Sequence, residues 1–347
     1  MVDLYNIPGD NKKDFRLKKF VEYQHEVPAT DFRFICAYID RHNLSKDEII
    51  FLFWLLSVTY SEISSIFLFD VLYNKRISYF DFWLENKENI NFGSAKKYNK
   101  NNDLFPELIL SFDSITNKKY FDWVSKGIVD DPIENYKIIH DKILSIKNSG
   151  RFSADLFLQV FVHKSEYFGF KTSQPYNLDW KSCANLTSGI YNIFYEDEKA
   201  NEFDKTGIVK DSEYEFLSDR LKDIQKKIIE MYPDENPEVY NFITKICSFR
   251  NLFKNARYAG FHHDRELGVI KNYEKNFPDY QRIWNECYEI RKEIFQHRFL
   301  GELNGWDGIR PERKKYWLKY GITCAEKNVD EILKINEMKL DYGLFEV

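Results

Sequence analysis

The sequence contains few of the residues that disulfide frameworks, turns and disordered segments require. Its 347 residues include 9 prolines, 14 glycines and five cysteines. The cysteines stand singly, without a CxxC pair or metal-ligand spacing, at Cys36, Cys183, Cys247, Cys287 and Cys324. Low proline and glycine disfavour disorder and a loop-rich β fold. Isolated cysteines predict reduced thiols in a cytoplasmic protein.

Membrane, export and nucleotide-binding signals are also missing. The longest apolar run, 49–57, is too short to cross a bilayer, so no membrane partner is expected. The first residues have neither a basic n-region nor an apolar h-region, so a signal peptide is not expected. The motifs Gly-x-x-x-x-Gly-Lys-Ser/Thr, Gly-x-Ser-x-Gly and Gly-x-Gly-x-x-Gly do not occur, which disfavours a P-loop kinase.

The chain also lacks an excess of positive charge. Its formal net charge is −5 and its pI is about 5.9. A surface made for general nucleic-acid binding would be strongly basic. Any nucleic-acid contact is therefore expected to be a local basic patch.

Apolar residues with a 3.6-residue period dominate the chain and predict an all-α fold. We expect one helical domain over 1–347, or two lobes at about 1–130 and 131–347. A capping box at Ser45 and Glu48 starts one of the helices. Polar composition predicts an exposed loop at 87–103 and an exposed loop or insertion at 195–213. The main expected helices are 31–42, 45–60, 61–72, 78–86, 105–112, 133–147, 152–162, 213–232, 237–253 and 280–300.

The stretch 150–158, Gly-Arg-Phe-Ser-Ala-Asp-Leu-Phe-Leu, lies between two of these helices. A polar break at 147–150 predicts a helix–turn–helix hairpin. The second helix would present free N–H groups and Arg151 at its start, which is a suitable seat for a phosphate. An ordinary interhelical turn explains the same pattern equally well.

A single carboxylate, Asp179, follows about twenty residues later, beside Trp180 and Lys181. A phosphate-binding hairpin followed at this distance by a single aspartate resembles the core of the helix–hairpin–helix DNA glycosylases, and this resemblance implies that Asp179 faces a flipped nucleotide. Asp179 also precedes a helical segment, where aspartate is a favoured N-cap. The two roles are compatible because catalytic residues often lie at helix starts.

Three cations, Arg250, Lys254 and Arg257, share one helical face without intervening acids. Their mutual repulsion favours a bound anion such as a phosphate, pyrophosphate or carboxylate, although a solvated basic face is the alternative. The next block, 258–266, contains His262, which can accept a proton near neutral pH, and Arg265. That block also fits a capped loop leading into a helix.

The end of the most apolar helix carries Tyr60 and Glu62. A buried Glu62 would have a raised pKa and could act as a base. A surface turn between helices is the alternative.

The order of four blocks, 54–61, 150–158, 179–189 and 257–265, resembles the phage amino acid:DNA transferases, or α-glutamyl/putrescinyl-thymine pyrophosphorylases. These are a branch of the helix–hairpin–helix DNA glycosylase-like fold. The resemblance covers roughly residues 15–320. The turn before Arg151 departs from the usual Gly-x-Gly hairpin by lacking a second glycine, which puts its grip on DNA in doubt.

The resemblance implies an enzyme that replaces the pyrophosphate of a pyrophosphorylated 5-hydroxymethyluracil in double-stranded phage DNA with an amino acid or polyamine, in the host cytoplasm. It makes Asp179, Glu62 or His262 the base. No cofactor is implied, although Mg²⁺ could accompany pyrophosphate. The implied substrate- and pyrophosphate-binding residues are Tyr60, Arg151, Lys181, Arg250, Lys254, Arg257 and Arg265.

Two other functions fit the same residues. A DNA glycosylase would use Asp179 to stabilise a developing sugar cation and would release free base. A non-catalytic helical DNA-binding protein would release neither base nor pyrophosphate. Pyrophosphate release therefore separates the transferase from both.

Overall fold

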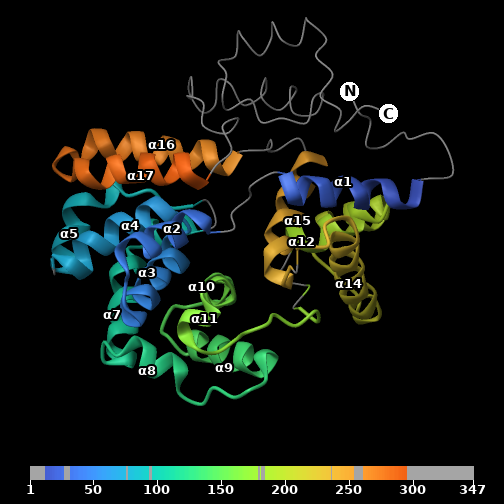
Figure 1. The fold of residues 1–347 in the computed structure, drawn as a ribbon, viewed down its shortest axis with the longest axis horizontal. Helices are drawn as coiled ribbons and strands as arrows, with labels where there is room; N and C mark the ends of the chain where they lie inside the picture. Colours follow the sequence, from blue (N-terminus) through green and yellow to red (C-terminus); the bar gives the residue numbers. More distant parts are fainter. Residues whose placement is uncertain are drawn as a thin grey trace, which may run out of the picture. The chain divides into compact units, whose positions relative to one another are not determined.

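The structure, a computed structural model, describes residues 12–26, 32–75, 77–93, 96–178, 180, 184–235, 237–253 and 261–294. Every regular element in these ranges is helical and none is a strand (Figure 1), which confirms the all-α prediction. None of the described helices combines the length and the apolar character that crossing a membrane requires.

The described residues form two compact units that interleave along the sequence. Unit 1 contains residues 12–26 and most of 174–265, and unit 2 contains most of 32–173 together with 266–294. The lobe boundary expected near residue 130 falls inside unit 2. Helices on both sides of residue 130 pack against the same central helix, α3 (Lys46–Thr59). These are α8 (Tyr120–Ser125) before residue 130 and α10 (Arg151–His163) after it.

Unit 2 is built around α3. The capping box predicted at Ser45 and Glu48 starts this helix, and its residues 49–59 are all buried. A helix that is apolar on every face must be covered on every side. The other helices of unit 2 are α2 (Arg33–His42), α4 (Glu62–Leu68) with a π-helical turn (Phe69–Asn74), α5 (Tyr79–Asn86), α6 (Lys97–Asn101), α7 (Leu104–Thr116), α9 (Pro132–Leu144), α11 (Ser165–Phe168), most of α16 (Phe261–Asn276), and α17 (Gln281–Ile294).

Helices α9 and α10 pack against each other, as the hairpin prediction requires. The connection is longer than expected, because α9 ends at Leu144 and α10 starts after Gly150. Gly150 has extended backbone (φ −135°), and the residue with positive φ is Asn148 (66°). The glycine is therefore not required by the turn's backbone, and a helix–hairpin–helix in the glycosylase sense stays a prediction.

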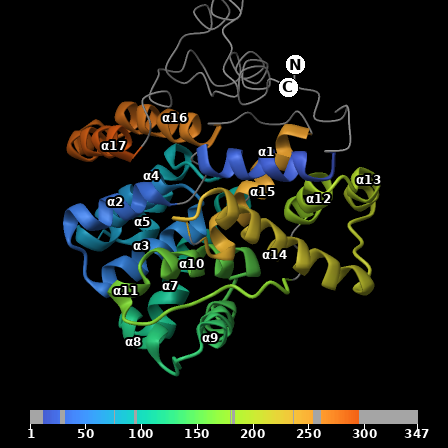
Figure 2. The ribbon, with the colours of Figure 1, turned by 45° about the vertical axis from the view of Figure 1, so that its right-hand side comes forward.

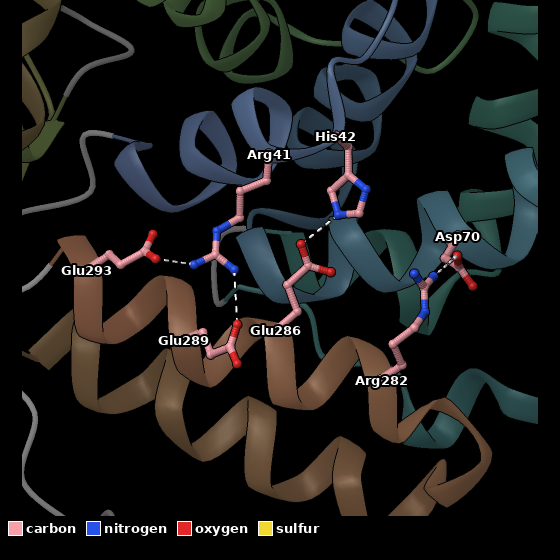
Figure 3. A network of polar contacts seen from close by, with 7 residues as sticks. All are labelled: Arg41, His42, Asp70, Arg282, Glu286, Glu289 and Glu293. Carbon is pink, nitrogen blue, oxygen red and sulfur yellow. Dashed lines mark hydrogen bonds and ion pairs between the residues drawn. The ribbon is translucent and has the colours of Figure 1, made fainter.

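A line of ion pairs connects unit 2's α2 and the π-helical turn to α17 (Figure 3). Arg41 pairs with Glu289 at 3.3 Å and with Glu293, and His42 Nε2 lies 2.6 Å from Glu286 Oε1. Ion pairs near the protein surface contribute little to stability, so we expect these pairs to stabilise the packing of α17 only slightly. The two views of the ribbon show α16 running beside α17 (Figures 1 and 2).

Unit 1 is organised around α12 (Ala184–Ile193), which packs against α15 (Val239–Phe253). A Cβ on Gly189 would lie 2.6 Å from Ile246 Cγ2, so the close approach of these two helices requires glycine there. The remaining helices of unit 1 are α1 (Lys12–Glu26), α13 (Asp197–Thr206) and α14 (Tyr214–Met231).

Both expected exposed loops contain helices, so those two predictions are wrong. The segment 195–213 contains α13, which buries Ala200 and Phe203. The segment 87–103 contains α6, and both its N-cap residue Lys96 and Asn99 within it are 1% exposed. Both helices are short and mostly polar, so a few buried residues are enough to dock them while leaving no clear apolar period in the sequence.

Candidate functional site

The end of α3 determines where the segment 90–99 lies. Tyr60 closes the helix in the left-handed conformation (φ 55°). Gly93 N–H then donates to Thr59 O at 2.8 Å, and Asn99 Nδ2 donates to another carbonyl of the last turn of α3 at 2.7 Å. A Cβ on Gly93 would lie 2.5 Å from Tyr60 O, so only glycine fits. The carbonyls left open at the end of α3 are thus satisfied by the segment that carries Lys96.

Lys96 is buried against the start of α10. Its Nζ donates to Ser153 Oγ, and lies 5.1 Å from the centroid of the Phe152 ring and 3.5 Å from the Tyr98 hydroxyl. No carboxylate of the described residues pairs with it, and burial lowers the pKa of Lys96 to about 8. A buried ammonium without a counter-ion is costly, which makes Lys96 a functional-site candidate.

The surface next to Lys96 is aromatic and carries positive charge. Phe152 and Tyr98 are each about 44% exposed, and the ring of Tyr60 meets that of Phe152 edge-on at 5.3 Å. Arg151 is exposed at the first position of α10. The first turn of α10 contains no acid, and Gly150 supplies no side-chain cap. This helix start therefore brings together the positive end of the helix dipole and the positive charges of Arg151 and Lys96.

A carboxyl group and a histidine lie on the side of α10 that faces α9. The Tyr136 hydroxyl donates to Asp155 Oδ1 at 2.7 Å, and His140 Nε2 lies 3.9 Å from the same oxygen. Burial raises the pKa of the Asp155 carboxyl, and the hydrogen bond from Tyr136 and the charge of Arg151 only partly offset this effect. Asp155 and His140 are therefore a candidate pair for accepting and releasing a proton.

Two of the residues expected at the site from the sequence, Tyr60 and Arg151, do lie at the start of α10. The ring of Tyr60 contacts the ring of Phe152 in the first turn of α10, so the sequence blocks 54–61 and 150–158 lie next to each other in the structure. Glu62 has a different contact. Its Oε2 accepts a hydrogen bond from Ile35 N–H at 2.8 Å, in the first turn of α2, where the N-cap residue Phe32 gives no side-chain cap. Glu62 thus caps a helix other than its own.

Arg250 lies in unit 1 and is 1% exposed. It forms an ion pair with Asp204, which also accepts a hydrogen bond from Ser188 Oγ at 2.6 Å. The anion expected to balance Arg250 is therefore supplied by the chain itself. The remaining candidates lie outside the described residues, either wholly (Asp179, Lys181, Lys254 and Arg257) or in their side chains (His262 and Arg265).

Sequence reasoning missed Lys96 because its neighbourhood is rich in lysine and asparagine. Nothing in the local pattern distinguishes Lys96 from Lys97, which is exposed, or from Lys100. The burial of Lys96 follows from the long-range contacts of Gly93 and Asn99 with the end of α3. Such contacts are not visible in a local period.

Within the described ranges, no three histidine, cysteine, aspartate or glutamate side chains are grouped so that they could hold a metal ion. Comparison with known proteins gives no match to a family model, a curated protein or a solved structure. The functional argument therefore rests on the geometry of this chain and on its sequence blocks.

The buried charge of Lys96 predicts an unusual effect of its removal. The pKa of Lys96 is about 8 in the folded chain and 10.5 in the unfolded chain. Below pH 8 the side chain is therefore charged in both states, and the burial of this charge lowers the free energy of unfolding. Lys96→Met should stabilise the protein at pH 7 by about 1–3 kcal/mol, after allowance for the lost bond to Ser153. Between these two pH values the unfolded chain binds more protons, so this gain should shrink as pH rises from 8 to 10.5. Urea unfolding of the wild type and of Lys96→Met at pH 7 and pH 10 measures this difference in the free energy of unfolding.

Lys97→Met is the matched control for that measurement, because Lys97 is exposed next to Lys96 and should give a small, pH-independent change. A Lys96→Met protein that is less stable than the wild type at pH 7, with a difference that does not depend on pH, would contradict the account of Lys96.

The cap that Glu62 provides can be tested in the same way. Glu62→Ala should lower the free energy of unfolding by about 1 kcal/mol, whereas Glu62→Gln, which keeps an oxygen acceptor for Ile35 N–H, should lower it by less than half as much. Equal losses for the two variants would show that the carboxylate charge of Glu62, and not its hydrogen bond, is what matters.

Proposed function

We propose that the protein transfers an amine onto a pyrophosphate-activated pyrimidine of double-stranded DNA and displaces the pyrophosphate. The observation that carries this proposal is Lys96, which is buried beside Ser153 at the start of α10 and has no counter-ion among the described residues. The resemblance of the sequence blocks supplies the substrate class, and two of those blocks contribute Tyr60 and Arg151 to the same place.

The reaction makes two demands on the protein. The amine nitrogen attacks the methylene carbon attached to C5 of the base, and a C–N bond forms as the C–O bond to pyrophosphate breaks. Pyrophosphate departs with the electron pair of that bond and needs positive charge around it. The incoming ammonium must lose one proton before the attack and a second one afterwards, so the site needs a proton acceptor.

Lys96, Arg151 and the N–H groups of the first turn of α10 meet the first demand. An anion bound here would supply the counter-ion that Lys96 lacks among the described residues. The energy spent on burying Lys96 would then be partly recovered when the anion binds. This exchange of stability for binding is common at functional sites.

Asp155 and His140 add a candidate proton acceptor to Asp179 and His262. The contact between the two side chains, and the burial that raises the pKa of the Asp155 carboxyl, make the pair a candidate for accepting this proton. The contact of Glu62 with Ile35 N–H makes Glu62 the weakest of the bases considered. The exposed rings of Phe152 and Tyr98 provide stacking surfaces for a base that has left the DNA helix.

Incubation of pyrophosphorylated DNA with the protein and a panel of amines tests the proposal. We expect pyrophosphate to be released and an amine-substituted nucleoside to appear in mass spectra of the digested DNA. Lys96→Met should reduce the turnover rate about 100-fold or more, the loss expected for one group that stabilises developing negative charge. Lys97→Met should leave the rate unchanged.

Other outcomes of this experiment would point elsewhere. Release of free base would assign a glycosylase and overturn the transferase. If pyrophosphate is released at the same rate by the Lys96→Met protein as by the wild type, the reaction occurs at a different place in the chain.

A further inference from the structure

Unit 2 exposes a group of large apolar side chains on α5 and α7, which pack against each other. Phe80 and Leu84 lie one turn apart on α5, and Ile77 comes just before this helix. Leu84 is 72% exposed, more than any other large apolar side chain of the described residues. Leu110 of α7 and Ile115, in its last turn, are also exposed. Apolar surface gathered in this way marks an interaction site, whereas single exposed residues do not.

Two hollows join these side chains into one surface. They have volumes of about 590 Å³ and 460 Å³, and Leu110 lines both of them. Phe80 and Ile77 line the first hollow, and Ile115 lines the second. We call this surface, made by Ile77, Phe80, Leu84, Leu110 and Ile115 with the two hollows, the α5–α7 face.

The hollows of the α5–α7 face carry positive charge. Among the described residues that line them, the charged ones are Lys118 in the first hollow and Lys147 in the second. Their side chains are 71% and 75% exposed. Lys118 lies 3.6 Å from Asp113, and Lys147 lies 3.9 Å from Glu107. Exposed pairs of this length are weak, so both lysines can turn to an acid of a partner.

Asp113 does not depend on Lys118 for its partners. Its two carboxylate oxygens accept hydrogen bonds from the hydroxyls of Tyr79 and Tyr120, each at 2.7 Å. Lys118 is therefore the member of this group that a partner can recruit without leaving a buried carboxylate unsatisfied.

The negative charge of the α5–α7 face lies on α5. Asp81 and Glu85 directly follow Phe80 and Leu84 in the sequence, and both acids are exposed. Helix α5 thus presents an apolar ridge edged with acids, next to hollows edged with lysines. The face contains both halves of a complementary contact, because the ridge suits an apolar hollow and the acids suit the lysines.

We infer that the α5–α7 face joins two copies of this chain into a dimer with two-fold symmetry. A two-fold rotation sets the same face of each copy against the other. Because the acids and the lysines belong to different parts of the face, the rotation brings the acids of each copy to the lysines of the other. The ridge formed by Phe80 and Leu84 then packs into the hollows beside Leu110 of the second copy.

This dimer does not depend on the proposed function, since the α5–α7 face shares no residue with the candidate site at the start of α10. Sedimentation velocity of the full chain, over a range of protein concentrations and without DNA, tests it. We expect the mass to rise with concentration from the 41.8 kDa of one chain to twice that value and no further.

Leu84→Glu tests whether the α5–α7 face is the contact. The substitution leaves the fold intact because Leu84 is exposed, but it places a charge inside the apolar contact and should raise the dissociation constant of the dimer about 10-fold or more. Ile208→Glu is the matched control. Ile208 is 66% exposed in unit 1, outside the α5–α7 face, and its substitution should leave the dimer unchanged.

Charge reversal tests the arrangement of the two copies. Asp81→Lys with Glu85→Lys should weaken the dimer, and Lys118→Glu with Lys147→Glu should weaken it as well, because like charges then face each other. The chain with all four substitutions should regain the dimer, since every acid again meets a lysine. A variant that merely folds poorly would show no such recovery.

Three results would overturn the inference. A chain that stays at 41.8 kDa up to its limit of solubility forms no dimer, and its α5–α7 face is then left to an unrelated partner. A mass that keeps growing beyond two copies means that the contact is not two-fold. A dimer that Leu84→Glu leaves as tight as the wild type is formed through another surface.

Discussion

The burial of α3 on all sides is the constraint on which unit 2 depends. A helix with apolar residues around its whole circumference gains stability only when neighbours cover every face, at roughly 25 cal/mol for each Å² removed from water. Helices α4, α7, α8 and α10 provide this cover. The unpaired N–H and C=O groups at the two ends of α3 must be satisfied as well. At its start the capping box does this, and at its end the segment containing Gly93 and Asn99 does it.

The same constraint brings Lys96 into the interior. Two other buried cations of the described residues have acid partners in the protein: Arg16 pairs with Asp197, and Arg250 pairs with Asp204. Among the described residues, the groups that contact Lys96 Nζ are the hydroxyls of Ser153 and Tyr98 and the rings of Tyr98 and Phe152. A charge in this situation lowers stability, and a ligand anion is the simplest partner that would compensate for it. Lys96 thus links the packing of α3 to the proposed chemistry at α10.

Much of the fold could be predicted from local sequence patterns, because those patterns are made by single helices. The starts of α3 at Ser45 and of α5 at Ser78 follow from capping residues. The packed pair α9 and α10 follows from two apolar periods and a polar break. Short helices such as α6 escaped detection, since five mostly polar residues cannot display an apolar face.

The site was harder to predict, because long-range partners decide what each side chain does. The sequence makes Glu62 a plausible base, but in the structure its carboxylate accepts a hydrogen bond from Ile35 N–H. The sequence likewise makes Arg250 a plausible anion binder, but in the structure it pairs with Asp204. Tyr60 and Arg151 do lie at helix ends, where side chains and backbone groups are most available, but their roles in binding stay predictions. Lys96 could not be predicted, because only the fold distinguishes it from the exposed lysines beside it.

The most direct test of this account is the pKa of the Lys96 side chain, measured by NMR in the folded protein labelled at lysine. The account predicts a value of about 8 in the free protein, and a clear rise when pyrophosphate is added and supplies the missing counter-ion. A value near 10.5 in the free protein, or a low value that pyrophosphate leaves unchanged, would contradict it.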